Sequence, residues 1–197
     1  MNKLYLIFYY LIIYPIYKIQ FGNIGSRARI KSPLRLDGKR NIFIGKNVNI
    51  QKHTWLASIS IDGKDPSRLE IGDGSVIGHF NHIYCTHQII IGKKVLTADK
   101  VYISDNTHEF KDIEVPILDQ PVRNISSVSV GDGAWLGENV CIIGANVGKN
   151  SVIGANSVVT RDIPDFAVAV GSPAIVIKRY CIEDKIWKKT NSKGEFI

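Results

Sequence analysis

The stretch VGDGAWLGENVCI, residues 130–142, places an aliphatic residue at every sixth position: Val130, Leu136 and Ile142. Glycine follows the first two of these residues, and small or polar residues fill most positions between them. A period of six fits neither the two-residue repeat of a flat strand nor the 3.6-residue repeat of a helix. It is typical of a β-helix with a triangular cross-section, in which each hexad forms one short side and one corner.

The same hexad recurs along most of the chain, so the repeat defines the whole fold. Further hexads begin at Ile44, Ile71, Ile77, Ile91, Thr97, Val147 and Ile153. We expect the residue that begins each hexad to point into the prism. Gly, Asn and Asp suit the corners because they tolerate positive φ. The sequence thus predicts an all-β domain, a parallel β-helix, over residues 40–179.

One long interruption divides the repeat. Residues 109–127 carry charges and two prolines but no hexad, which predicts a loop that leaves the β-helix. Loops longer than about 12–15 residues are usually functional or disordered. His108 is the last residue before this excursion loop, so it is expected at a corner of the prism beside the loop.

The two ends of the chain differ from the repeat. Residues 1–39 form an apolar segment and lead-in, of which residues 4–17 are apolar or aromatic throughout. This run is shorter than the roughly 20 residues that a spanning helix needs, and no small-residue cleavage site follows it. We expect a helix that Pro15 breaks near its end. Residues 180–197 are expected to form a short helix and a frayed tail.

Two roles for the apolar segment stay open. It could pack on the rest of the protein or on a neighbouring subunit. It could instead lie in a membrane interface, because tyrosines suit the headgroup region. Such an anchor would allow peripheral contact with the inner membrane.

The composition excludes several classes of protein. The 197 residues are 45% hydrophobic, which is enough for one well-filled domain. The net charge of +7 favours anionic ligands, but no basic cluster with interleaved aromatics indicates nucleic acid. Cys85, Cys141 and Cys181 are odd in number and widely spaced, so neither a disulfide framework nor a thiolate metal site is indicated. A reducing cytoplasm is the expected location.

The hexads, Thr107-His108 before the loop, Trp135 and the Gly171-Ser-Pro-Ala ending together resemble the hexapeptide-repeat O-acetyltransferases. The resemblance covers residues 40–180. It is closest to the enzymes that modify sugars of bacterial surface polysaccharides, and more distant to the maltose and galactoside acetyltransferases. It implies a left-handed β-helix that forms a homotrimer, with acetyl-CoA bound between subunits and no metal. The implied reaction is acetyl transfer to a sugar hydroxyl.

The resemblance also implies a general base, and His108 matches it. A sugar hydroxyl is a poor nucleophile at pH 7, and a neutral imidazole in hydrogen-bond reach can take its proton during attack on the thioester. Direct transfer then needs no covalent intermediate. Asp105, Asn106 and Glu109 are the candidates for orienting the imidazole.

Acceptor-site candidates come from the segment before His108. By the resemblance, Asn81 or His79 matches an asparagine-bearing segment that lines the acceptor pocket, and His82 matches a histidine of the polysaccharide subgroup. Gln120 and Arg123 on the loop are weaker candidates. The acidic acceptor-binding residue of the galactoside-type enzymes has no equivalent that we can place, which argues against a simple free sugar.

The resemblance places the CoA site on the C-terminal coils. Trp135 would pack against the pantetheine or the loop, and small residues would let the pantetheine arm approach the backbone. A basic residue would face the phosphates, although Ile175 replaces one arginine of the family and Arg179 is the candidate substitute. The matched CoA residues are Trp135, Gly137, Ala155, Thr160, Arg161 and Lys178.

Three other functions stay open. The same fold hosts γ-class carbonic anhydrases, and His82 and His87 have the H-x4-H spacing of their zinc ligands. An N-acetyltransferase of an amino-sugar nucleotide could have a similar site, although the nucleotide-binding domain that such enzymes often carry is missing. A β-helical scaffold with a degenerate site would bind no CoA.

Overall fold

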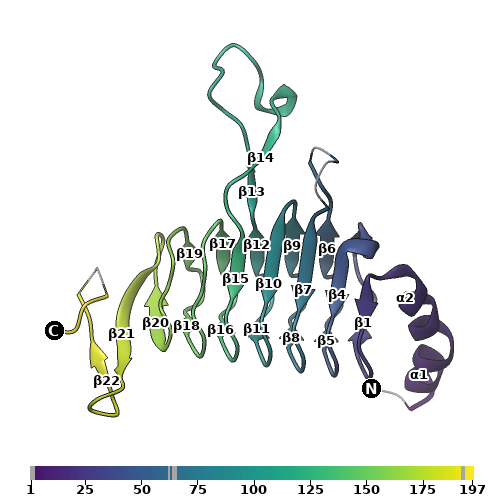
Figure 1. Cartoon of the computed structure of the whole chain (residues 1–197), viewed down its shortest axis with the longest axis horizontal. Helices are drawn as coiled ribbons and strands as arrows, with labels where there is room; N and C mark the ends of the chain where they lie inside the picture. The colour runs from purple at the N-terminus through teal and green to yellow at the C-terminus, as the bar shows by residue number, and fades with distance from the viewer. Residues whose placement is uncertain (1–2, 62, 64–65, 192–193) are drawn as a thin grey trace.

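The computed structural model of the chain describes residues 3–61, 63, 66–191 and 194–197. Its strands form three mainly parallel sheets and one short two-stranded sheet, β13 (Asn106–His108) with β14 (Val122–Asn124) (Figure 1). Sheet A contains β1 (Asn23–Ile24), β4 (Ile42–Ile44), β7 (Arg68–Ile71), β10 (Gln88–Ile91) and β15 (Val128–Val130).

The other two sheets complete the triangle. Sheet B contains β2 (Arg29–Ile30), β5 (Asn49–Ile50), β8 (Val76–Ile77), β11 (Leu96–Thr97), β16 (Trp135–Leu136), β18 (Val152–Ile153) and β20 (Ala167–Val170), and it continues into the C-terminal strands β21 (Ile175–Cys181) and β22 (Ile186–Lys189). Sheet C contains β3 (Arg35–Asp37), β6 (Trp55–Ser58), β9 (His82–Cys85), β12 (Tyr102–Ser104), β17 (Cys141–Ile143) and β19 (Val158–Val159). From β1 to β12 and again from β15 to β17 the chain visits the three main sheets in rotation, and after β17 isolated bridges at Val147 and Ile163 replace the strands of sheet A. This rotation confirms the predicted left-handed β-helix.

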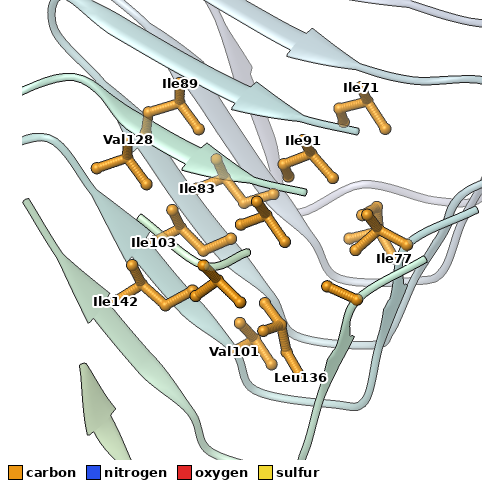
Figure 2. Packing of buried hydrophobic residues seen from close by; sticks show 14 of the residues in the cluster. Ile71, Ile77, Ile83, Ile89, Ile91, Val101, Ile103, Val128, Leu136 and Ile142 are labelled. Atoms are coloured by element: carbon orange, nitrogen blue, oxygen red, sulfur yellow. The ribbon is translucent and has the colours of Figure 1, made fainter. Parts of the chain in front are cut away.

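Residues that begin hexads line the inside of the prism, as the sequence predicts (Figure 2). Ile71, Ile77 and Ile83 begin three successive hexads, lie on sheets A, B and C in turn, and are buried. Ile83 aligns with Ile103 and Ile103 with Ile142, so each coil stacks its aliphatic residues on those of the next. Burying one such side chain contributes roughly 1.5–3 kcal/mol, which makes this core the main source of stability.

Aspartates at the corners join neighbouring coils. Asp73 Oδ1 accepts a hydrogen bond from the Lys46 N–H of the preceding coil at 2.7 Å. Asp132 Oδ1 accepts one from the Lys93 N–H at 2.7 Å. Corner asparagines take positive φ as predicted, with 56° at Asn139. The small polar residues of the hexad therefore have a structural role in stacking the coils.

The β-helix begins earlier than residue 40. β1, β2 and β3 form a complete coil within the segment that the sequence analysis treats as a lead-in, and the buried Ile24 and Ile30 face inward from it. The signal was present in the sequence, because Ile24, Ile30 and Leu36 are spaced by six. The charged and polar residues between them concealed it.

A helix covers this N-terminal end (Figure 1). It runs through α1 (Lys3–Phe8), a π-helical turn η1 (Tyr9–Ile13) and α2 (Tyr14–Gln20). Contrary to expectation, Pro15 does not break it. Proline lacks an N–H and its ring excludes a carbonyl four residues earlier. The wide π turn, in which the Tyr14 N–H donates to the Tyr9 carbonyl, directly precedes the proline and makes room for the ring.

The C-terminal residues form an antiparallel hairpin, so the prediction of a short helix within residues 180–197 is wrong. β21 (Ile175–Cys181) folds back on β20 with Ala167 opposite Arg179, and β22 (Ile186–Lys189) pairs with β21. The β-branched run Ile-Val-Ile at 175–177 favours a strand. The hairpin also pairs backbone groups that the last coil would otherwise leave open at the sheet edge.

The excursion loop stands on a short stem. β13 (Asn106–His108) pairs antiparallel with β14 (Val122–Asn124), and the loop projects away from the prism (Figure 1). The loop contains the 3₁₀ turn η3 (Ile117–Asp119), which lies shortly before β14 in the chain, and a second 3₁₀ turn, η2 (Lys39–Asn41), precedes β4. Gln120 is buried and its amide donates to the carbonyls of Asp112 and Val115. Gln120 therefore fixes the loop's own shape.

Candidate active site

His108 lies in a pocket between the loop stem and the outer face of sheet C. The pocket has a volume of about 370 Å³. The imidazole of His108 is exposed and makes no hydrogen bond to the part of the chain that the structure describes. The lining residues are His82, Tyr84, Tyr102, Asn106, Thr107, His108 and Ile143. The structure thus brings together His108, His82 and Asn106, three of the residues that the sequence analysis selects.

The alternation of strand residues explains this lining. Ile83 and Ile103 point inward, so their neighbours His82, Tyr84 and Tyr102 must point outward from the same sheet. Tyr102 pairs with His82 across adjacent strands, which places aromatic rings of successive coils side by side.

His82 sits within a cluster of aromatic rings. Its ring stacks on Trp55 with centroids 4.1 Å apart and planes 8° apart. Tyr84 meets it edge-on at 5.8 Å, and Tyr102 lies tilted at 5.2 Å. Burial lowers the pKa of His82 below its ordinary value, so the imidazole is neutral at pH 7.

One nitrogen of the His82 ring lacks a hydrogen-bond partner in the described part of the chain. Nε2 is buried and has no hydrogen-bond partner among the described residues. Buried polar atoms are nearly always paired, and leaving one unpaired costs about 1–3 kcal/mol. A hydroxyl of a bound molecule would satisfy this nitrogen.

Trp55 is held rigidly as the base of this cluster. Its Nε1–H donates to Asp37 Oδ2 at 2.9 Å. The Arg35 guanidinium lies 5.1 Å from the Trp55 ring centroid and pairs with the same carboxylate at 2.7 Å. The outer face of sheet C therefore offers a fixed aromatic surface beside His108, which the sequence analysis did not identify.

The three candidates for orienting His108 have other partners. Asp105 is fully buried, and its carboxylate accepts hydrogen bonds from the backbone N–H groups of residues 86–88, each at 2.8 Å. Asn106 donates to the Tyr84 carbonyl at 3.1 Å. Glu109 pairs with Arg123 at 3.1 Å. Asp105 fixes the corner beneath the stem, so its effect on His108 is indirect.

Asn81 and His79 lie at the corner between sheets B and C, outside the pocket. Asn81 is 1% exposed; its Nδ2 donates to Thr97, and its Oδ1 accepts from the Val101 N–H. These bonds leave it little capacity for an acceptor molecule. His79 Nδ1 lies 3.2 Å from an Asp99 oxygen. Of the three predicted acceptor residues, only His82 lines the pocket.

The six residues matched to CoA by resemblance also lie outside the pocket. Trp135 is half exposed on the outer face of β16, and Lys178 is exposed on β21 of the same sheet. Thr160 and Arg161 are exposed after β19.

Gly137 and Ala155 are explained by the stacking of coils. A Cβ on Gly137 would lie 2.7 Å from the backbone nitrogen of Ala155 in the next coil. Glycine is thus required at this corner whether or not pantetheine passes over it. Ala155 is exposed at the matching corner, where a small side chain leaves the backbone accessible.

Cys85 does not provide a nucleophile. The thiol is buried, and Sγ lies 3.6 Å from Asp105 Oδ2. Burial and the nearby carboxylate raise the pKa of Cys85 to about 12, so the thiol is protonated at pH 7.

The histidines of the zinc alternative do not converge within one chain. His82 faces outward from sheet C, whereas His87 is exposed at the next corner. The His53 ring stacks on Phe80 at 5.0 Å at another corner. Within the described residues of a single chain, no three His, Cys, Asp or Glu side chains gather closely enough to hold a metal ion.

Comparison with known proteins decides the family. Residues 127–161 match the motif described as the hexapeptide repeat of succinyl-transferase. The chain is 38% identical over 167 residues to WbbJ of Escherichia coli K12, whose name assigns it to O-acetyl transfer in lipopolysaccharide biosynthesis. That alignment covers 81% of this chain and 83% of WbbJ. The chain belongs to the hexapeptide-repeat acetyltransferase family. The family and the enzyme class expected from the sequence, acetyl-CoA-dependent O-acetyltransferase, are thereby confirmed.

Other relatives differ in length or share only the fold. Rv3034c of Mycobacterium tuberculosis, named as an acetyltransferase, is 38% identical over 149 residues, which are 70% of this chain but 49% of that protein. A maltose O-acetyltransferase from Clostridium difficile 630 superimposes with a TM-score of 0.53 at 28% identity, covering 84% of this chain and 73% of that one. The N-acyltransferase AntD from Bacillus cereus has a TM-score of 0.70 at 19% identity, covering 87% and 90%, and shows the fold alone.

Proposed function

We propose that this enzyme transfers acetyl from acetyl-CoA to a sugar hydroxyl of a bacterial surface polysaccharide, such as O-antigen, capsule or exopolysaccharide, or of its precursor. The observation that carries the proposal is the pocket in which His108 lies beside His82, Tyr84 and Tyr102. Aromatic rings pack against the C–H face of a sugar ring, while the unpaired His82 Nε2 can bond a hydroxyl. The similarity to WbbJ supports the same acceptor class.

In this reaction His108 acts as the general base. Its neutral imidazole accepts the proton of the sugar hydroxyl as the oxygen attacks the thioester carbonyl carbon. The resulting oxyanion collapses and breaks the C–S bond, and the departing CoA sulfur takes the proton back from the imidazolium. Such a base contributes typically 10²- to 10⁴-fold to the rate. Cys85 takes no part, because its thiol stays protonated.

CoA binding is proposed to involve a neighbouring subunit. We assign Trp135, Thr160, Arg161 and Lys178 to the donor site of a homotrimer, because they are exposed on the prism but outside the His108 pocket. The enzyme would work in the cytoplasm, where acetyl-CoA is available.

The test is to incubate the protein with acetyl-CoA carrying a labelled acetyl group and with O-deacetylated surface polysaccharide or its lipid-linked precursor. Label that enters the saccharide and is released by mild alkali identifies an ester and supports O-acetylation. Label that resists alkali identifies an amide and supports transfer to an amino sugar. No incorporation into any saccharide, with the protein folded and bound to acetyl-CoA, contradicts the proposal.

A further inference from the structure

The N-terminal helix has two apolar faces, and only one of them packs on the β-helix. On the inner face, Tyr9 is buried and its hydroxyl accepts the Ile30 N–H at 2.9 Å. The Tyr14 hydroxyl donates to the Gly25 carbonyl at 3.2 Å, and Phe21 is buried in the core. These contacts fix the helix across the end of the prism (Figure 1).

The outer face carries large apolar side chains in contact with solvent. They recur at spacings of three or four residues, so they form one stripe along the helix. Their exposed fractions are 47–69%. The stripe consists of Ile7, Phe8, Leu11, Ile12, Ile16 and Ile19. A continuous exposed apolar stripe of this kind marks an interaction surface in a soluble domain.

The charge around this end identifies the kind of partner. Residues 1–61 contain ten of the chain's 25 Lys and Arg residues but one of its 18 Asp and Glu residues, Asp37. The net charge of residues 1–61 is therefore +9. Because the net charge of the whole chain is +7, residues 62–197 have a net charge of −2. Arg29 and Lys52 also add to the effect of burial in lowering the pKa of Lys31. All of the positive excess therefore lies in the third of the chain that carries the apolar stripe.

We infer that the stripe docks on an anionic lipid surface and lies within its interface, parallel to the bilayer. An interfacial helix buries its apolar face about 5–10 Å below the headgroups, and nearby basic residues add attraction to anionic lipids. None of the described helices has the length and apolarity needed to cross a bilayer. A second copy of the chain is a poorer occupant, because a self-contact would bring two strongly positive ends together.

The test is co-flotation of the full-length protein with vesicles, which does not depend on any acetyl transfer. The expected result is binding to phosphatidylcholine vesicles that contain phosphatidylglycerol, and at least about tenfold weaker binding to pure phosphatidylcholine or at high ionic strength. Leu11→Glu and Ile19→Glu should each weaken binding at least about tenfold, because each places a charge where an aliphatic side chain enters the lipid.

Ile182→Glu is the matched control. It makes the same chemical change at an exposed isoleucine that directly follows β21. β21 lies at the opposite end of the prism from the helix (Figure 1), so this variant should bind vesicles like the parent. The circular dichroism and melting temperature of all variants should match the parent, since none of these side chains is buried. Equal vesicle binding by Leu11→Glu and by the parent would overturn the inference. The inference would also be overturned if the parent did not bind anionic vesicles and the Leu11→Glu variant had a lower sedimentation coefficient than the parent. The stripe would then join copies of the chain.

Discussion

Replacing Asp105 by asparagine tests how the corner beneath the active site is built. The carboxylate is fully buried. Oδ1 accepts the Thr86 N–H at 2.8 Å, and Oδ2 accepts the N–H groups of His87 and Gln88 at 2.8 Å each. The asparagine side chain has nearly the same shape but offers one acceptor oxygen. In either orientation its NH₂ group faces backbone donors instead of accepting from them.

The expected loss of stability follows from those contacts. Each buried donor left unpaired costs about 1–3 kcal/mol, and either orientation of the amide loses one or two of the three backbone bonds. We therefore expect Asp105→Asn to lower the free energy of unfolding by about 2–4 kcal/mol. For a chain of this length, about 1 kcal/mol shifts the melting temperature by roughly 2–4 °C, so the expected shift is about 4–16 °C.

The assay is thermal and urea unfolding at one fixed protein concentration, since an oligomer's stability depends on concentration. Asp119→Asn is the control, because it removes the same charge from an exposed position in the loop and should change stability by less than about 0.5 kcal/mol. The reasoning is refuted if Asp105→Asn unfolds together with the parent, or if the two variants lose the same stability.

Three further predictions concern the pocket and the buried thiol of Cys85. Burial lowers the pKa of His82, so the unfolded chain takes up a proton on this imidazole at a higher pH than the folded chain does. The free energy of unfolding should therefore fall as the pH drops below about 6.5. His82→Gln should reduce that fall, measured as melting temperature between pH 7.5 and 5. Cys85→Ser should keep the turnover rate within about threefold, and iodoacetamide should not inactivate the parent, because the pKa of Cys85 is about 12 and no thiolate is available. If the Tyr102 ring packs on the sugar, Tyr102→Val should raise the KM for the saccharide about tenfold and leave the KM for acetyl-CoA unchanged. Equal changes in both KM values would show that Tyr102 does not contact the saccharide specifically.

The repeat made the fold predictable, but only where the hexad was unbroken. Ile71, Ile77 and Ile83 could be assigned to the interior because six-residue spacing is local information. The first coil was missed because Arg29, Lys31 and Arg35 surround its inward residues, although these charges simply point outward. The terminal hairpin was missed because its pairing depends on the open edge that β20 leaves, and that edge exists only after the coils have stacked.

The active-site cluster was less predictable for a related reason. His108 could be found from its position before the loop. Trp55, His82 and Tyr102 belong to three different coils, and their contact depends on the lengths of the insertions between those coils. The alternation around Ile83 already predicted that His82 and Tyr84 face outward, but only the register of sheet C brings Trp55 onto His82.

The most direct test of the central claim is the steady-state rate of acetyl transfer by His108→Ala, compared with His87→Ala. Both histidines are exposed, but only His108 lines the pocket. The account predicts that His108→Ala lowers kcat about 10²- to 10⁴-fold with acetyl-CoA binding retained, whereas His87→Ala stays within about twofold of the parent. A His108→Ala enzyme that transfers acetyl at the parent rate would contradict the assignment of His108 as the general base.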